Sequence, residues 1–182
     1  MVKNLSSDSE IQLVRQCLNG STVAQKQMYE SLAPRMFAVC IRYLGNREEA
    51  KDVMHDGFIT LFSKLDTFKG DGSFEGWARR IFVNASLMQL RKKDILKQHG
   101  NVEEYGNDIG YDPSIIDKID SQTLMKLVSQ MPAGFRTVFN MYAIEGFSHQ
   151  EIAKALDITE GGSRSQLSRA KIWLKEKLKN YR

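Results

Sequence analysis

The 182-residue sequence has little proline, little cysteine and no long hydrophobic run. Three prolines in a chain of this length favour helices. Cys17 and Cys40 stand among aliphatic residues at helical spacing, which favours small buried side chains over a disulfide. No stretch approaches the ~20 apolar residues of a membrane span, and MVKNLSSDSEIQ lacks the apolar core of a signal peptide. The sequence therefore predicts a cytoplasmic protein without membrane insertion.

Arrangements of catalytic and metal-binding residues are also missing. There is no P-loop and no dinucleotide-binding glycine fingerprint. The three histidines have no Cys or carboxylate partner at ligand spacing: His55, His99 and His149. Asp52 and Asp56 lie one turn apart and could share a cation, but without a further acidic cluster a solvated or docking face is favoured. We therefore expect no enzyme activity, no cofactor and no metal.

Charge divides the chain into three parts. Residues 1–97 hold 15 Lys and Arg against 11 Asp and Glu, and residues 121–182 hold 10 against 5. Residues 98–120 hold one basic and six acidic residues, with three glycines and Pro113. Two basic modules joined by an acidic connector suggest two contacts with a polyanion. We predict an all-α protein: domain 1–97, a flexible acidic linker 98–120 and domain 121–182.

The stretch from Ser148 to Lys171 has the pattern of a helix-turn-helix. Ser148 and Glu151 form a capping box, and Thr159 is a good N-cap for the next helix. Small polar and basic residues of the second helix are expected to face outward: Arg164, Ser165, Ser168, Arg169 and Lys171. This layout suits a recognition helix in a DNA major groove. The alternative is a surface hairpin with a solvated basic face.

Hydrophobic spacing predicts further helices in both domains. A helix over 47–65 buries Met54, Phe58 and neighbours, and its polar face is either solvated or a docking surface. The glycine-rich loop 66–73 could hold an unstacked base beside Phe68, or be a plain surface loop. For the helix from 74 to about 93 we expect two stripes. The inward stripe is Trp77, Ile81, Ala85 and Met88, and the outward one is Arg80, Asn84, Leu87 and Arg91. A helix over 133–144 should pack through Phe135, Val138, Phe139 and Tyr142.

Three segments in this order carry a family resemblance. They are AKDVMHDGFITLF, then DTFKGDGSFEGWARRIFVNAS, and after the acidic linker MPAGFRTVFNMYAIEGFSHQEIAKALDITEGGSRSQLSRAK. Together they resemble the bacterial sigma-70 family, in its small extracytoplasmic-function (ECF) group. The resemblance implies a transcription initiation factor that binds core RNA polymerase and directs it to promoters. The rival interpretation is a stand-alone helix-turn-helix regulator that binds duplex DNA without polymerase.

The resemblance also implies roles for individual residues. Polymerase binding, through the β′ clamp helices, falls to Asp52, His55, Asp56 and Phe58. Capture of the single-stranded −10 element falls to Phe68, Lys69, Gly70, Asp71, Ser73, Phe74, Trp77, Arg80 and Asn84. Contact with the duplex −35 element falls to Arg164, Ser165, Ser168, Arg169 and Lys171. Further expected partners are the polymerase β flap and an anti-sigma factor. By the same analogy the acidic linker threads toward the RNA exit path.

Three positions depart from the family pattern. His55 stands where Gln is frequent, and Gly57 stands where a bulkier residue is frequent. Gly57 is expected to weaken its helix by up to ~1 kcal/mol. Glu160-Gly161-Gly162-Ser163 opens the recognition helix where many members have Gly-Thr-Val, and the two glycines should soften its first turn.

Overall fold

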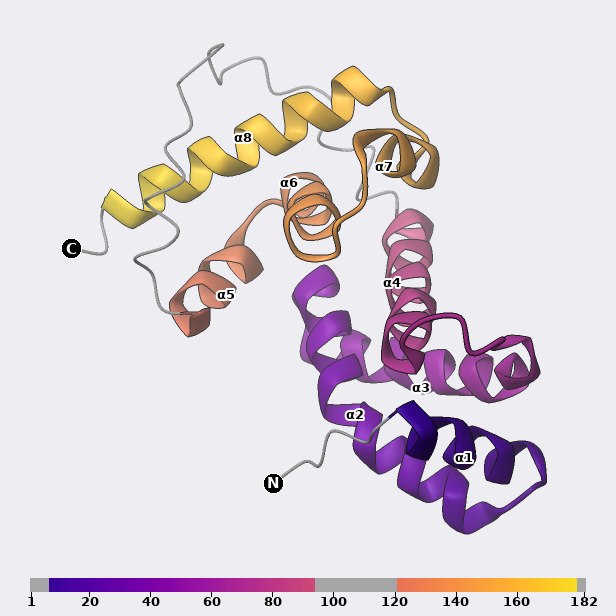
Figure 1. The fold of residues 1–182 in the computed structure, drawn as a ribbon. Helices are drawn as coiled ribbons and strands as arrows, with labels where there is room; N and C mark the ends of the chain where they lie inside the picture. Colours follow the sequence, from indigo (N-terminus) through magenta and orange to yellow (C-terminus); the bar gives the residue numbers. More distant parts are fainter. Residues whose placement is uncertain (1–6, 94–120, 180–182) are drawn as a thin grey trace. The chain divides into compact units, whose positions relative to one another are not determined.

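The computed structural model describes residues 7–93 and 121–179, and every regular element in those ranges is a helix (Figure 1). The all-α fold class is therefore confirmed. The chain divides into two compact units, Met1–Gln89 and Leu90–Arg182. The predicted acidic linker, residues 98–120, lies outside the described residues. Within the described ranges, no helix is long and apolar enough to cross a membrane.

Local signals in the sequence set the helix limits of the first unit. Its elements are α1 (Ser7–Leu18), α2 (Thr22–Leu44), α3 (Arg47–Ser63), the 3-10 helix η1 (Leu65–Thr67) and α4 (Phe74–Lys92). The Ser21 side chain caps α2, which ends where Gly45 adopts a left-handed φ of 72°. Asn46 then accepts the backbone N–H groups of Glu48 and Glu49 and starts α3. The glycine at 45 and the capping asparagine at 46 thus determine where α2 ends and α3 begins.

An aromatic cluster joins three helices of this unit. The ring of Phe58 on α3 lies 4.5 Å from Tyr29 on α2 and 5.0 Å from Phe82 on α4, measured between centroids. Gly57 is buried beside it, and a Cβ added there would lie 2.5 Å from two carbons of the Phe82 ring. The expectation for Gly57 was therefore incomplete. The glycine costs helix propensity, but it also creates the space in which Phe82 packs.

The orientation of α4 differs from the prediction. Ala78, Phe82, Val83 and Leu87 are buried at 3% exposure or less, whereas Met88 is 60% exposed. The predicted inward stripe was wrong, because Trp77, Ile81 and Ala85 are only half-buried. Leu87, assigned to the outward stripe, belongs to the core. Apolar residues occur on both sides of this helix, and the contact of Phe82 with Phe58 and Gly57 decides which side faces inward.

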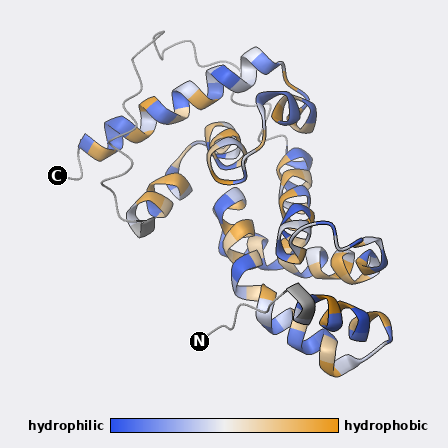
Figure 2. Cartoon of the chain, viewed as in Figure 1, coloured by the Kyte–Doolittle hydropathy of each residue, from blue (hydrophilic) through white to orange (hydrophobic). Residues whose placement is uncertain are grey.

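The second unit is built from α5 (Ser121–Gln130), α6 (Ala133–Phe139), the π-helix η3 (Asn140–Ile144), α7 (His149–Leu156) and α8 (Glu160–Lys179). Figure 2 shows hydrophobic residues spaced along its helices between hydrophilic ones. The buried ones are Ile152, Ala153 and Leu156 on α7, and Leu167, Ala170 and Leu174 on α8. The two helices therefore pack through one shared apolar seam.

The helix predicted over 133–144 changes type before its end. From Asn140 the turn widens, and the N–H of Glu145 bonds to the carbonyl of Asn140, five residues back, at 3.0 Å. Phe135, Val138 and Phe139 are buried as predicted. Tyr142 is not, since it is 41% exposed, and its assignment to the core was wrong. The wider turn shifts Tyr142 out of the register that a regular α-helix would give it.

The two cysteines are buried free thiols, as predicted. Burial raises the pKa of Cys40 to about 11, against a smaller opposing effect of a hydrogen bond with Ser86. Both side chains therefore act as small apolar core residues.

Candidate nucleic-acid interface

The exposed face of α3 carries the predicted docking residues. Asp52, His55 and Asp56 are all exposed and are spaced so that they lie on one side of the helix. Ile59, one turn further along the same side, is 70% exposed, and the sequence interpretation did not include it. Phe58 is only 4% exposed, so it supports this face from the core rather than lying on it. The result is an acidic surface with one large aliphatic side chain.

The loop between η1 and α4 presents a polar rim. Lys69, Gly70, Asp71 and Ser73 are exposed, and Gly70 and Gly72 have φ values of 81° and 92°. Residues with side chains rarely adopt such values, so the two glycines allow the tight path of the loop. Ser73 accepts the N–H of Gly76 at 3.3 Å and thereby helps to start α4.

Three aromatic rings lie at the base of this loop. The Phe68 centroid is 5.1 Å from that of Phe74 and 5.5 Å from that of Trp77, and Phe74 and Trp77 stack at 5.6 Å. Phe74 is buried at 5% exposure, while Phe68 and Trp77 are half-buried. Phe74 therefore backs the cluster, and the other two rings keep surface that a base could contact. The structure brings these predicted residues together, although Phe68 is packed rather than fully exposed.

The outer face of α4 continues from the aromatic rings. Arg80, Asn84, Met88 and Arg91 are exposed and recur every three or four residues after Trp77. Glu75 lies at the start of the helix, where it pairs with Arg35 of α2 and with Arg79 at 3.5 Å. Arg80 and Asn84 thus project outward from a helix whose beginning is fixed to α2. Arg and Asn side chains are suited to phosphates and base edges.

The helix-turn-helix of the second unit is built as predicted. The Ser148 hydroxyl accepts the Glu151 N–H at 3.2 Å, and the Glu151 carboxylate accepts the Ser148 N–H at 2.8 Å. Asp157 adopts a left-handed φ of 56° in the turn. Thr159 accepts the N–H of Gly162 at 2.9 Å, and a Cβ on that glycine would lie 3.2 Å from the same oxygen. The lack of a side chain at Gly162 therefore lets the Thr159 hydroxyl approach its N–H closely. This is a role in addition to the predicted softening of the first turn.

The second helix of this motif, α8, presents its predicted polar residues unequally. Arg164, Ser165 and Ser168 are exposed, whereas Arg169 and Lys171 are half-buried. Arg164 pairs with Glu160 one turn earlier, at 3.0 Å, in an exposed position. An exposed ion pair of this kind is weak, at about 0.3–0.5 kcal/mol, so a phosphate can replace Glu160 as its partner.

His149, at the start of α7, is a polar residue of this surface that the sequence interpretation left unassigned. Its Nδ1 lies 2.9 Å from Oγ of Ser163 on α8, and its ring stacks on Tyr142 with centroids 4.5 Å apart. Burial and the charges of Arg164 and Lys171 lower the pKa of His149 below its ordinary 6.5, against the opposing effect of Glu160. The pairing could not be found from sequence, because His149 and Ser163 are fourteen positions apart.

No group of three or more His, Cys, Asp or Glu residues that could hold a metal ion occurs within 7–93 or 121–179.

Two family models match the chain in succession. Sigma-70 region 2 matches residues 28–95, and Sigma-70, region 4 matches residues 121–174. The first match contains α3, the loop and α4, and the second contains the helix-turn-helix. Together they cover about two thirds of the 182 residues.

Curated relatives carry the same family name. The chain is 28% identical over 150 residues to the ECF RNA polymerase sigma factor SigE of Mycolicibacterium smegmatis, covering 80% of this chain but 58% of the relative. It is 23% identical over 180 residues to the ECF RNA polymerase sigma factor SigW of Bacillus subtilis, covering 92% and 95% of the two chains. The similarity to SigW thus extends over nearly the full length of both proteins.

A solved structure has a similar fold. It is the complex of the sigma factor RpoE with the anti-sigma factor NepR from Bartonella quintana, with a TM-score of 0.51 and 24% sequence identity. The similarity covers 86% of this chain and 98% of that one. At this identity the likeness concerns the fold alone.

Proposed function

The chain belongs to the sigma-70 family of RNA polymerase sigma factors, in its ECF group, and we propose that three of its surfaces divide the work of initiation. The protein is a promoter-directing initiation factor for RNA polymerase. In the proposed division, the α3 face binds polymerase, the loop and α4 bind the −10 element, and α8 binds the −35 element.

For polymerase binding we assign the exposed face of α3. Asp52, His55 and Asp56 supply acidic and hydrogen-bonding groups there, and Ile59 supplies an apolar contact. Phe58 contributes by holding the helix in place through Tyr29 and Phe82. Acidic groups around one exposed aliphatic side chain suit a basic partner surface with an apolar patch.

For the −10 element we assign the loop and the outer face of α4. Phe68 and Trp77 offer ring surface to an unstacked base, with the exposed polar rim of the loop around them. Arg80 and Asn84 extend the contact to the strand backbone and base edges, and Met88 continues the same face. Stacking on aromatic rings contributes ~1–3 kcal/mol per base, which offsets the few kcal/mol of unstacking.

For the −35 element we assign the outer residues of α8, led by Arg164, Ser165 and Ser168. Arg169 and Lys171, which are half-buried, contribute from the sides of that face. A second helix that presents basic and small polar groups is the reading element of a helix-turn-helix. In this role α8 anchors the upstream end of the promoter while the first unit holds the melted strand.

The protein needs no chemistry of its own in this scheme. Binding of one unpaired strand, added to duplex contacts, shifts the promoter from its closed to its open state. We further propose regulation by an anti-sigma factor that covers these surfaces. The complex with NepR supports this by analogy, since in it a sigma factor of similar fold is bound to an anti-sigma factor. The β flap of polymerase is a further proposed contact of the second unit.

The observation that carries the proposal is the exposed face that runs from Phe68 and Trp77 along α4 through Arg80 and Asn84. Duplex binding by α8 alone would not need aromatic rings beside an exposed Arg and Asn in the other unit. A stand-alone regulator would use its first domain for dimerisation or ligand binding instead. The two functions therefore differ in what happens when polymerase is added.

We test the division of work with two double variants in a reconstituted holoenzyme. Arg80→Ala with Asn84→Ala should retain affinity for core polymerase but lose promoter opening, read by permanganate reactivity of unpaired thymines. Asp52→Asn with Asp56→Asn should lose affinity for core polymerase, because the acidic contacts are neutralised at constant size. Glu30→Gln, which removes one exposed acidic group from α2, is the matched control and should affect neither.

Two results would contradict the proposal. Strong sequence-specific binding of duplex DNA by the protein alone, with no initiation in the presence of polymerase, would favour the stand-alone regulator. Unchanged polymerase affinity in the Asp52 and Asp56 variant would remove the assignment of α3. Circular dichroism and melting of each variant show whether it is folded.

A further inference from the structure

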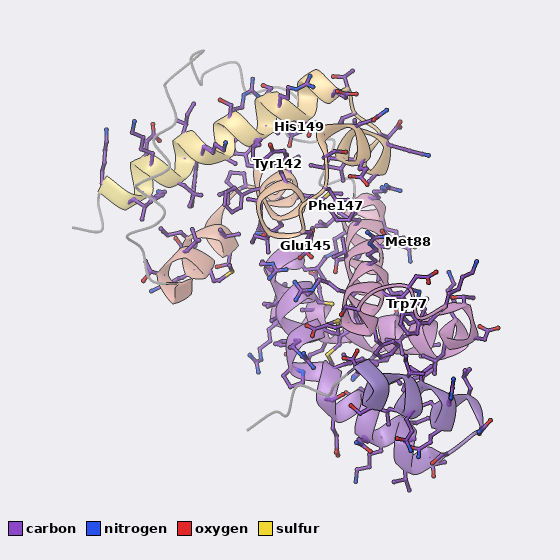
Figure 3. All side chains as sticks on the ribbon, in the orientation of Figure 1. Trp77, Met88, Tyr142, Glu145, Phe147 and His149 are labelled. Atoms are coloured by element: carbon purple, nitrogen blue, oxygen red, sulfur yellow. The ribbon has the colours of Figure 1, made fainter. Side chains whose placement is uncertain are left out.

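His149 is held from two sides by residues of two other elements. On one edge of its ring, Nδ1 lies 2.9 Å from the hydroxyl oxygen of Ser163 on α8, and Ser163 is fully buried. On one face, the ring stacks on Tyr142 of η3 at an interplanar angle of 22°. Figure 3 labels both residues. The ring is itself half-buried. With Nδ1 engaged in this way, the second ring nitrogen, Nε2, is the ring atom that can form a hydrogen bond with a ligand.

The Ser163 hydroxyl determines what Nε2 can do. A hydroxyl can both donate and accept a hydrogen bond. With neutral His149, the hydroxyl can donate to Nδ1, and Nε2 then carries the proton. With protonated His149, Nδ1–H donates to the hydroxyl oxygen, and Nε2–H remains a donor. In both of these states Nε2–H can donate to an acceptor outside the protein. In the protonated state the imidazole ring also carries a positive charge.

The charged groups around His149 come mainly from the recognition helix. Arg164 and Lys171 of α8 act on it as positive charges, and Glu160 of α8 acts on it as a negative one. Glu160 is paired with Arg164 at 3.0 Å. Within α7, Glu151 is bonded to Ser148, and from η3 the facing group is the phenol ring of Tyr142. His149 thus lies beside the cations of the proposed −35 surface, although it belongs to the other helix.

We propose that His149 is a phosphate-binding residue of the second unit, with Nε2–H donating to a backbone phosphate beside the site that α8 reads. The proposal rests on the function proposed above for α8. In a helix-turn-helix the first helix crosses the DNA backbone while the second enters the groove, and α7 is that first helix. A phosphate contact positions the protein without reading a base, so His149 contributes to affinity for every promoter sequence.

The contact makes promoter binding dependent on pH. In the free protein the pKa of His149 is below its ordinary value, because of burial and of Arg164 and Lys171. A bound phosphate is an opposite charge and favours the protonated ring, so the pKa in the complex is higher than in the free protein. Binding then takes up a proton in the interval between the two pKa values. Affinity for DNA therefore rises as the pH falls through that interval.

The test measures promoter binding by the reconstituted holoenzyme against salt concentration, at about pH 6 and about pH 8. His149→Gln keeps a donor but has no charge. At the lower pH its slope of log Kobs against log[KCl] should be smaller by about 0.9, the value for one phosphate contact. Its affinity there should fall roughly tenfold, as expected for one charge-assisted hydrogen bond. At the higher pH, it should differ little from wild type.

Two further variants complete the experiment. His149→Arg has a permanent charge that can also stack on Tyr142, so it should keep the steep slope at both pH values. Lys26→Gln removes one positive charge from the exposed side of α2 and should leave the slope unchanged. Equal slopes for wild type and His149→Gln at the lower pH would overturn the inference. If the holoenzyme forms no specific promoter complex at all, the proposed function fails instead.

Discussion

Gly57 on α3 faces the ring of Phe82 on α4 so closely that a Cβ at Gly57 would lie 2.5 Å from two ring carbons. The Phe82 ring in turn packs edge-on against Phe58 at 5.0 Å and is fully buried. It therefore cannot move aside without disturbing the aromatic cluster. The face of α4 that carries Arg80 and Asn84 is oriented by this contact.

We predict that Gly57→Ala destabilises the protein. Alanine would gain ~1 kcal/mol of helix propensity, but overpacking of a buried site costs typically 1–3 kcal/mol. Because the added Cβ would lie 2.5 Å from a fully buried ring, the cost should fall in the upper half of that range. The expected net loss is then about 1–2 kcal/mol in the free energy of unfolding, measured by denaturant titration of the full chain. Gly57→Ala combined with Phe82→Leu should lose less than the sum of the two single changes, because the smaller side chain leaves space for the methyl group.

Gly161→Ala is the matched control. Gly161 also lies in a helix, but a Cβ there meets no atom closer than 3.8 Å, and the residue is exposed. The same substitution should therefore stabilise the second unit by about 0.5–1 kcal/mol. If Gly57→Ala raised stability as Gly161→Ala does, the close contact with Phe82 would not be important for packing.

Arg136 joins α6 to the end of α5 in the second unit. Its buried guanidinium donates to the carbonyl oxygens of Ser129 at 3.0 Å and Met131 at 3.3 Å, and burial lowers its pKa. Arg136→Met should destabilise this unit by about 1–3 kcal/mol, because it removes the donor from a buried bond to the Met131 carbonyl and from a part-buried bond to the Ser129 carbonyl. In hydrogen exchange, the amides of α5 should exchange faster in Arg136→Met than in wild type, while those of α3 in the first unit should exchange as before. Arg136→Lys should restore part of the loss, and equal exchange in all three proteins would contradict the prediction.

The capping box is expected to stabilise the start of α7. Ser148→Ala removes the acceptor of the Glu151 N–H and should cost about 1 kcal/mol, measured by thermal unfolding. Glu151→Ala removes the reciprocal bond to the Ser148 N–H. The Ser148 hydroxyl also donates to the Glu151 carboxylate at 2.9 Å, and each single variant already loses this bond. The double variant should therefore lose less than the two single losses added together. Strict additivity would show that the two bonds act independently.

Phe68 is expected to matter for strand capture and little for polymerase binding. Phe68→Ala removes one of the two half-exposed rings and should weaken binding of single-stranded −10 oligonucleotide by the holoenzyme by ~1–3 kcal/mol, the contribution of one stacked base. Phe68→Tyr keeps the ring and should bind like wild type. Phe68→Leu keeps bulk without a ring, so normal binding by this variant would argue against stacking. Affinity for core polymerase is the internal control.

Short-range signals predicted much of this fold correctly. The predicted Ser148–Glu151 box acts over a few residues and starts a helix in the structure, and Ser21, Gly45 and Asn46 start or end helices in the same short-range way. The order of polar and apolar residues likewise indicated the helix-turn-helix. Such features depend on neighbours within one helical turn, and the sequence contains them directly.

The errors occurred where packing between distant residues decides the outcome. On α4, apolar side chains on two sides made both orientations possible until Phe82 met Phe58. Tyr142 was assigned to the core because a regular helix was assumed, and the π turn at Asn140 moved it outward. His149 had no visible partner, since Ser163 and Tyr142 reach it only through the folded unit.

The sequence by itself determined that this protein is helical, that it has two basic modules and that it belongs with the sigma factors. The first two follow from helical periodicity and the distribution of charge, and the third follows from the resemblance of three segments, in their order, to that family. Only the tertiary structure decided which side of α4 faces outward, why Gly57 is a glycine and which groups surround His149. The physical reason is that each of these depends on the volume and orientation of side chains brought together from different helices.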